Sequence, residues 1–424
     1  MQKLSLLILL LFTICFGGHS QETIRLMHYN LLNYGINTGG CNNSNNNVND
    51  KNDNLLTIMD YLNPHVLTVN EINCSVQTYD KLLTGCLDEY MSDMFERVDK
   101  TCPSSSDLSN MIYFRKDIFG FHSQYVIPTN VRDINVVKLY YKSANLGQDP
   151  DTIFLNCIIT HLKAGSDWDD EIERTDETNR LMNFLEQNSE IENYLLLGDL
   201  NIYRASEQAF QNLINYSNPS FRFYDPINMI GEWHNNSSYS MIHTQSTHTV
   251  HNCFIPGGMD DRFDFILISN DILSAENKVS FDQNSYRAVG QDGKRFNKNL
   301  IESPSNTSVP SNVLNALYNL SDHLPVVMDL YVGENALVGE KHEFGEVYFE
   351  NPVKETITLR FAYPAKRNVR IKLYSTSAVC VADMTKNAGL DIIEIPIQHL
   401  RTGIYFMEIY IENKKRLVKK IVKI

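Results

Sequence analysis

The chain has 424 residues, of which 43% are hydrophobic and 10% are aromatic. This length exceeds one average core and favours two or three domains, and the apolar content excludes wholesale disorder. The formal net charge is −14: the part from Glu340 onward has 15 Lys+Arg against 10 Asp+Glu, which leaves −19 on residues 1–339. An acidic body repels polyanions, which argues against a tight, non-specific nucleic-acid binder but not against a nuclease that works through metal ions.

The first 21 residues have the pattern of a secretory signal peptide. Lys3 precedes an apolar run from Leu4 to Phe16, which is followed by a polar exit. The run is shorter than the roughly 18 to 20 apolar residues that a membrane span needs. Cys15 lacks the small preceding residues of a lipoprotein cleavage site. We therefore predict that residues 1–21 are removed, that the chain has no stable membrane span, and that the protein is secreted or lies on the cell surface.

From residue 22 to about residue 335, short apolar runs alternate with longer amphipathic stretches, which predicts a mixed α/β domain. Helices are expected at Asn54–Leu62 and Asp170–Asn188. Surface loops are expected in the polar stretches 37–54, 102–110 and 282–311. The expected strands are Ile24–Tyr29, His65–Asn70, Asn110–Arg115, Thr152–Thr160, Tyr194–Leu197, Phe263–Ser269 and Pro325–Val332.

The composition changes after Val332. From about residue 345 to residue 424 there are short runs of alternating apolar and polar residues, such as 356–360, 369–373 and 403–409. This period of two predicts a small all-β domain at 345–424.

Seven cysteines remain once residues 1–21 are removed. None of them forms a CxxC pair, so the sequence gives no support for a structural zinc site. An oxidising destination permits disulfides, for which Cys41, Cys74, Cys86 and Cys102 are the crowded candidates, with their pairing left open. The odd number leaves at least one thiol unpaired.

Polar residues adjoin four of the expected strands. Glu71, His161 and Asp199 follow strands closely, and the pair Asp322 and His323 precedes one. Each alone is commonly a surface, loop or turn residue. Together they predict a site at one rim of a sheet, because strands that end in polar groups project them from that rim.

The residue types indicate attack of water on phosphorus with the help of a hard cation. Mg²⁺, or Mn²⁺ or Ca²⁺ in its place, needs oxygen ligands, which Glu71 and Asp322 could supply with Asn30 or Asn201 nearby. The cation would neutralise charge on the phosphoryl oxygens and on the leaving group.

A histidine–carboxylate pair is expected beside this cation. Asp264 shares a strand face with Ile266 and Ile268, and a carboxylate on an apolar face needs a partner. His323 is the natural candidate and would give general-base or transition-state assistance. Asp199 and Asn201 would position the water and a phosphate oxygen. The absence of GxSxG and P-loop motifs leaves no competing nucleophile.

Six motifs occur in an order that resembles the endonuclease/exonuclease/phosphatase superfamily, the deoxyribonuclease-I-like proteins. They span about 310 residues: 28–33 (HYNLLN), 69–71 (VNE), 160–162 (THL), 198–201 (GDLN), 261–267 (DRFDFIL) and 321–323 (SDH). The resemblance implies a four-layer α/β sandwich, with two packed mixed β-sheets flanked by helices. It covers residues 22–335.

The same resemblance implies roles for the motif residues. Metal binding is implied for Asn30, Glu71 and Asp322, and catalytic roles are implied for His161, Asp199, Asn201, Asp264 and His323. His161 would contact a phosphate oxygen or the leaving group. One departure is informative: abasic-site endonucleases have an acidic ligand two residues after the first asparagine, where this chain has Leu32. Repair activity is therefore not expected.

The C-terminal domain resembles the sorting domain of type IX secretion. The cues are Asn351-Pro352-Val353, Gly403-Ile404-Tyr405 and the basic end at 419–424. The resemblance implies that the type IX machinery is a partner and that this domain forms a small all-β sandwich with no catalytic part. The alternative is an ordinary β-sandwich binding module.

Three functions follow from these observations. The preferred one is an extracellular endonuclease that hydrolyses DNA or RNA as a monomer. The second is a non-nuclease phosphoesterase that acts on sphingomyelin, another phospholipid head group or a small phosphorylated molecule, and the acidic body favours it. The third is a catalytically inactive surface binding protein, which the intact set of motif residues disfavours.

Overall fold

The computed structural model describes residues 22–99, 101–102, 106–143, 146, 152–275, 277–333, 347–348, 353–361, 368–376, 379–389, 392–411 and 414–424. The predicted signal peptide at 1–21 lies outside these residues. The predicted domain limits at 335 and 345 also lie outside them and stay predictions, as does the Asn351-Pro352 cue.

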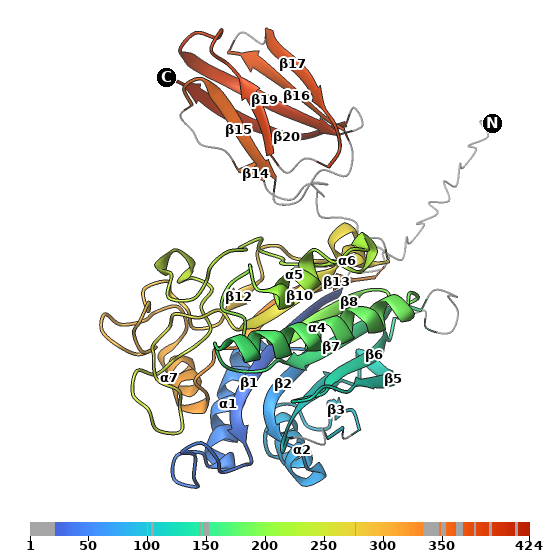
Figure 1. The fold of residues 1–424 in the computed structure, drawn as a ribbon, viewed down its shortest axis with the longest axis vertical. Coiled ribbons are helices and arrows are strands. Elements are labelled where there is room, and N and C mark those ends of the chain that lie inside the picture. The colour runs from blue at the N-terminus through green and yellow to red at the C-terminus, as the bar shows by residue number, and fades with distance from the viewer. Residues whose placement is uncertain are drawn as a thin grey trace, which may run out of the picture.

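The strands of the chain up to residue 333 form two mixed β-sheets (Figure 1). In the first sheet β1 pairs parallel with β2, and its other described pairings are antiparallel. Its order is β11 (Val279–Phe281), β13 (Val326–Val332), β1 (Glu22–Tyr34), β2 (Val66–Asn73), β4 (Leu108–Arg115) and β3 (Phe95–Arg97), with β12 (Arg287–Ala288) also on β13.

The second sheet has the same mixed character. Its one parallel pair among the described strands is β7 with β8. Its order is β5 (Phe119–Ile127), β6 (Ile134–Tyr141), β7 (Phe154–His161), β8 (Tyr194–Asp199), β10 (Asp264–Ser269) and β9 (Phe223–Tyr224).

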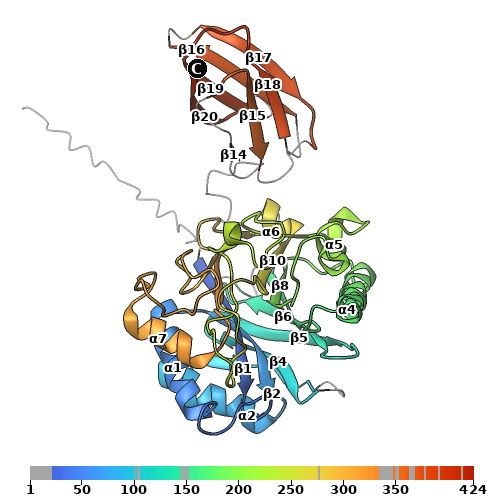
Figure 2. The ribbon, with the colours of Figure 1, turned by 60° about the vertical axis from the view of Figure 1, so that its left-hand side comes forward.

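Strand alternation explains how the layers pack. Along β8, Leu195 and Leu197 belong to the core between the two sheets, whereas Tyr194 and Leu196 belong to a second core beneath the helices. Figure 2 shows both sheets between α4 and α5 on one side and α1 and α7 on the other. The structure thus confirms the predicted α/β fold with two packed mixed sheets and outer helices.

Helix α1 has clear start and stop signals. The side chain of Asn47 accepts hydrogen bonds from the backbone N–H groups of Asn49 and Asp50, and Asn63 ends the helix in the left-handed conformation. The helices are α1 (Val48–Leu62), α2 (Val76–Leu82), α3 (Asp88–Tyr90), α4 (Trp168–Gln187), α5 (Gln208–Ile214), α6 (Asn270–Ser274) and α7 (Ser311–Leu320), with a π-helical turn at Leu83–Leu87 and 3₁₀ turns at Pro219–Phe221 and Ser237–Tyr239.

The expected loop at 37–54 is partly wrong, because α1 already begins at Val48. Its first turn is polar and rich in asparagine, which hid the helix in the sequence. The loop expected at 102–110 likewise ends early, since β4 begins at Leu108. The antiparallel pair β5 and β6 and the helix α7 were not predicted from the sequence.

Two disulfides form, Cys41–Cys253 and Cys74–Cys102. Cys253 was not among the crowded candidates, and it lies 212 residues from its partner. Of the cysteines in the described ranges, three are free, among them the buried candidate Cys86.

The C-terminal strands form two antiparallel sheets around one small core. The sheets are β14 (Val347–Tyr348), β15 (Thr356–Phe361) and β18 (Ile392–Pro396), and β17 (Cys380–Lys386), β16 (Val369–Ser375), β19 (Gly403–Ile411) and β20 (Lys414–Lys423). Ile357 and Ile395 of the first sheet and Ile371 and Ile409 of the second are fully buried in the shared core. This confirms the predicted small all-β domain.

Candidate active site

The predicted site residues lie at adjoining strand ends in the two sheets. In the first sheet, the parallel strands β1 and β2 place Asn30 beside Asn70. In the second sheet, the parallel strands β7 and β8 place His161 beside Asp199, and the antiparallel strand β10 places Asp264 beside Asp199 from the other side. Carboxyl ends of parallel strands meet at one edge of a sheet, so these polar groups gather at that edge.

Two buried amides join the sheets at this edge. Asn30 Nδ2 donates to Glu71 Oε1 at 3.1 Å and to Asp199 Oδ2 at 3.0 Å, while Asn30 Oδ1 accepts from the backbone N–H of Leu32 at 3.0 Å. Asn70 Oδ1 accepts from the backbone N–H of Asp199 at 2.9 Å. These bonds hold the carboxylates of Glu71 and Asp199 close together, one from each sheet.

The backbone near these carboxylates is strained. Glu71 has a φ of 56° and Asn201 a φ of 50°, in the left-handed region. Asparagine tolerates this region, but for glutamate it costs on the order of 1–3 kcal/mol. The pairing of β1 with β2 also shifts register after Asn30, and there the backbone N–H of Asn33 donates to Glu71 Oε2 at 3.0 Å. This geometry directs the Glu71 side chain toward the other sheet.

Lys51 of α1 binds backbone carbonyl groups of the same region. Its Nζ donates to the backbone oxygens of Leu31, Leu32 and Leu320 at 2.7, 2.8 and 2.8 Å. The side chain is buried, and burial lowers the pKa of Lys51 to about 7, although the charges of Asp322 and Glu71 act in the opposite direction. Lys51 thereby joins the irregular end of β1 to the segment that leads to Asp322.

The structure places the expected histidine–aspartate pair in contact. His323 Nδ1 lies 2.7 Å from Asp264 Oδ2, and both side chains are buried. Burial alone would lower the pKa of His323, but the carboxylates of Asp264 and Asp199 outweigh it and raise that pKa well above its ordinary value. Although burial opposes it, His323 in turn lowers the pKa of Asp264. The pair is therefore an imidazolium–carboxylate pair at neutral pH.

Gln245 and His28 complete the surroundings of this pair. Gln245 Nε2 lies 2.7 Å from His323 Nε2, and His28 Nε2 lies 3.6 Å from Asp264 Oδ1. A protonated His323 has two donors, so it fits Gln245 when that amide presents its oxygen. Neither Gln245 nor His28 was predicted as a site residue. His28 stands in the first motif, but Gln245 gave no signal in the sequence.

Burial shifts the pKa values of Asp199 and His161 in opposite directions, and in both cases it favours the neutral form. Burial raises the pKa of Asp199 to about 7; the charges of Asp264 and Glu71 also raise it, against His323. Burial lowers the pKa of His161 well below its ordinary value, so this imidazole is neutral. His161 Nε2 lies 3.6 Å from Asp199 Oδ2 and 3.9 Å from Glu71 Oε1.

Asn201 lies directly beside Asp199. Its backbone N–H donates to Asp199 Oδ1 at 3.0 Å, and its side-chain amide donates to the backbone oxygen of Leu162 at 3.1 Å. The bond to Leu162 holds the Asn201 side chain at the end of β7, close to His161.

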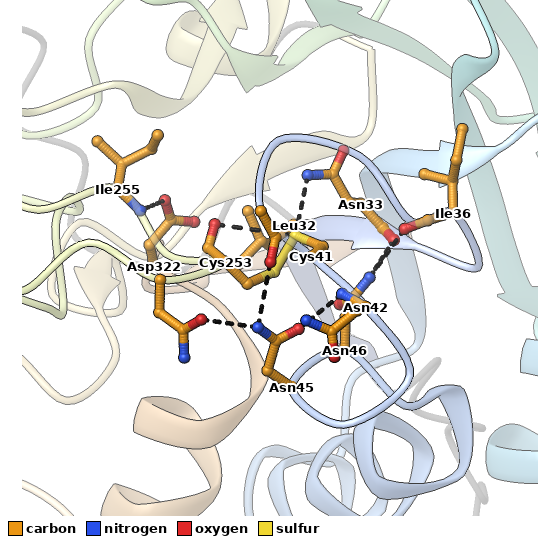
Figure 3. Close-up of a disulfide and its surroundings, with 12 residues drawn as sticks. Leu32, Asn33, Ile36, Cys41, Asn42, Asn45, Asn46, Cys253, Ile255 and Asp322 are labelled. Carbon is orange, nitrogen blue, oxygen red and sulfur yellow. Dashed lines mark hydrogen bonds between the residues drawn. A yellow bond between two sulfur atoms is a disulfide. The ribbon is translucent and has the colours of Figure 1, made fainter.

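Asp322 is held by a separate loop (Figure 3). The backbone N–H of Ile255 donates to Asp322 Oδ2 at 3.0 Å, whereas the buried Asp322 Oδ1 has no hydrogen-bond partner in the described structure. The same loop is tied to the segment after β1 by the Cys41–Cys253 disulfide. Burial raises the pKa of Asp322, and the charge of Glu71 adds to this effect.

All eight predicted site residues thus lie around one edge of the two sheets. Six are linked by hydrogen bonds or by side-chain atoms within 4 Å, Asn201 is linked through its backbone, and Asp322 acts on its neighbours through its charge. The six directly linked residues are Asn30, Glu71, His161, Asp199, Asp264 and His323.

The residues fit a hard divalent cation. Four buried or half-buried carboxylates, against the one imidazolium of His323, leave an excess of negative charge that oxygen-seeking cations compensate. The unpartnered Asp322 Oδ1 supplies an oxygen donor, as do the carboxylates of Glu71 and Asp199, whose ligand atoms lie with that of His161 within 4.8 Å of one another.

Residues 348–424 match the family model described as a secretion system C-terminal sorting domain. The C-terminal unit is a sorting domain. This confirms the prediction made from its sequence and indicates secretion or cell-surface localisation through the corresponding machinery. Within the part of the chain that is described, no helix is both long and apolar enough to cross a bilayer.

Several solved structures are similar to this chain. They include the human Nocturnin catalytic domain (14% identity, TM-score 0.46, 74% of this chain and 98% of that one) and an endonuclease/exonuclease/phosphatase from Bacteroides vulgatus (13%, 0.47, 74% and 100%). A third is D. rerio TDP2 complexed with single-strand DNA product (13%, 0.45, 73% and 98%). No curated protein matches the chain.

The raised pKa of Asp199 makes stability depend on pH. The folded state holds this proton more tightly than the unfolded state, in which the pKa is near 3.8, so stability falls as pH rises from there through about 7. Asp199→Asn should therefore stabilise the EDTA-treated protein by on the order of 3 kcal/mol more at pH 8 than at pH 5. Urea unfolding of both proteins measures this difference. Asp53→Asn, on the exposed face of α1, is the control; an equal gain for Asp199→Asn at both pH values would contradict the assignment.

Lys51→Met should destabilise the protein, because three buried carbonyl oxygens lose their donor. The expected loss in urea unfolding is on the order of 3 kcal/mol. Lys116→Met removes an ammonium whose partner Asp93 is exposed, so it should cost less than about 1 kcal/mol. Equal effects of the two substitutions would show that Lys51 does not hold the site backbone.

Proposed function

We propose that residues 22–333 form a divalent-metal-dependent phosphodiesterase that is exported with the help of its sorting domain. The observation that carries the proposal is the convergence of Glu71 and Asp199 with the His323–Asp264 pair at one edge of the packed sheets. Packing alone requires none of these charges to lie together, since burying unpaired carboxylates costs free energy. This argues against the alternative of a catalytically inactive binding protein.

In the proposed reaction, a water oxygen forms a bond to phosphorus and the P–O bond to the leaving group breaks. Asp199 orients this water and, with a pKa of about 7, accepts its proton near neutral pH. The backbone N–H of Asn201 donates to Asp199 Oδ1 and so orients this carboxylate, while its side-chain amide donates to a phosphate oxygen. A divalent cation bound by Glu71 and Asp322, with Asn30 nearby, would neutralise charge on the phosphoryl oxygens and on the leaving oxygen.

The two histidines take different parts. From the sequence, His323 could act either as a general base or as a group that stabilises the transition state. Its raised pKa favours the second, because an imidazolium cannot accept a proton but donates to a phosphoryl oxygen. Asp264 keeps it charged and oriented. His161, which is neutral, donates its N–H to a phosphate or leaving-group oxygen.

Two substrate classes fit this chemistry. The first class, which the sequence motifs favour, is DNA or RNA. The charge of −19 on residues 1–339 nevertheless repels a polyanion unless cations intervene. The second candidate is a phosphodiester outside nucleic acids, such as a lipid head group or a small molecule. A specific observation favours it: a pocket that borders Gln245 is lined by four carboxylates. The predicted monomer stays a prediction.

His323→Ala should lower kcat for hydrolysis of bis-p-nitrophenyl phosphate in Mg²⁺ by roughly 10²- to 10⁴-fold, because the imidazolium is lost. EDTA should abolish the activity of the parent. The exposed His122, on β5, provides the control His122→Ala, which should keep parental activity. The proposal is overturned if the full chain hydrolyses neither this diester nor plasmid DNA nor RNA in Mg²⁺, Mn²⁺ or Ca²⁺. Hydrolysis of DNA or RNA would identify the protein as a nuclease.

A further inference from the structure

A cavity of about 520 Å³ adjoins the proposed catalytic groups. Its lining includes Gln245, which contacts His323, and Phe263, which precedes Asp264. Tyr203, two residues after Asn201, and Ile255, which binds Asp322, also line it. Each of these residues neighbours a different group of the site, so a substrate whose phosphate lies at His323 would extend one of its substituents into this cavity.

The cavity carries an excess of negative charge. Glu171, Glu232, Asp260 and Asp261 line it, against the single guanidinium of Arg204. That guanidinium is already paired with Glu171 at 2.6 Å. Among the described residues, no lysine or arginine forms an ion pair with the other three carboxylates.

The carboxylates of Asp260 and Asp261 are neighbours in the cavity wall, and the charge of Asp260 adds to the cost of ionising Asp261. Burial raises the pKa of Asp261 to about 6, to which the charge of Asp260 adds, and burial raises the pKa of Asp260. The one cationic candidate beside them is His234, whose Nδ1 lies 2.8 Å from Asp261 Oδ1 and whose side chain is half exposed. A cation placed in the cavity would relieve this repulsion, whereas a second phosphate would increase it.

The size and the rings of the cavity indicate an organic cation. A volume of about 520 Å³ is that of a small-molecule pocket and far exceeds the need of a metal ion. The rings of Tyr203 and Phe263 form part of its wall, their centroids 5.0 Å apart. Aromatic rings and carboxylates together attract ammonium groups, above all quaternary ones, which are poor hydrogen-bond donors.

Resting on the proposed phosphodiesterase function, we infer that this cavity binds an amine or quaternary ammonium group joined through a short linker to the scissile phosphate. Such a group occurs in water-soluble phosphoesters and in zwitterionic lipid head groups. The second source has support on α4, where Trp168 and Ile172, which are close to the lining residue Glu171 in sequence, are 73% and 50% exposed. Exposed tryptophan and isoleucine suit the interface of a lipid surface.

The test compares two soluble diesters with the same reporter group, p-nitrophenyl phosphorylcholine and p-nitrophenyl ethyl phosphate, using the full chain in Mg²⁺. We expect kcat/KM to be at least about tenfold higher for the choline ester. Asp260→Asn and Glu232→Gln should each reduce this ratio about three- to tenfold. Glu96→Gln, which removes a charge from an exposed position on β3, should leave the ratio unchanged.

A ratio near one in the parent, or an unchanged ratio in both pocket variants, would overturn the inference while the phosphodiesterase stands. If neither ester is hydrolysed, bis-p-nitrophenyl phosphate, DNA and RNA decide whether the proposed function stands, and calorimetry with choline chloride decides the inference. Binding that Asp260→Asn weakens would support it, and no binding would overturn it.

Sphingomyelin and phosphatidylcholine vesicles then distinguish the sources. Release of phosphocholine that Trp168→Ala reduces, without an effect on the soluble choline ester, assigns a lipid substrate. Intact vesicles beside rapid hydrolysis of the soluble ester assign a soluble phosphoester. Both outcomes support a cationic substituent in the cavity.

Discussion

The site depends on the contact of Asn30 with two carboxylates that come from different sheets. Its amide nitrogen lies between Glu71 and Asp199, and Asn70 repeats this link through the backbone of Asp199. Without these donors the carboxylates would repel one another in a buried space, where charge interactions are strong. The same hydrogen bonds therefore join the two sheets and fix the positions of the proposed catalytic groups.

The elements around the site hold it in place from several sides. Lys51 ties the irregular end of β1 to the segment before Asp322, and the Cys41–Cys253 disulfide ties the region after β1 to the loop that binds Asp322. A disulfide between residues so far apart in sequence limits the unfolded chain strongly and suits an oxidising destination. The disulfide therefore agrees with the secretion or cell-surface localisation that the sorting domain indicates.

The sequence predicted the fold class, and it indicated candidate site residues that lie together at one edge of the sheets, because these signals are local. Short apolar runs that end in Glu71, His161 or Asp199 show both a strand and its polar end. The start of α1 was missed because its asparagine-rich turn resembles a loop. The role of Lys51 was also missed, because one of its partners lies 269 positions away in the sequence. Gln245 and the partner of Cys41 were missed for the same reason: both depend on long loops whose path no local pattern encodes.

The most direct test of the central claim is calorimetric titration of Mn²⁺ into the full chain and into Glu71→Gln, a substitution that removes one charge and preserves the shape of the side chain. We expect saturable binding by the parent, at least about tenfold weaker binding by Glu71→Gln, and a parallel loss of phosphodiester hydrolysis. Equal Mn²⁺ affinity in the two proteins, or full hydrolysis by the parent in EDTA, would contradict it.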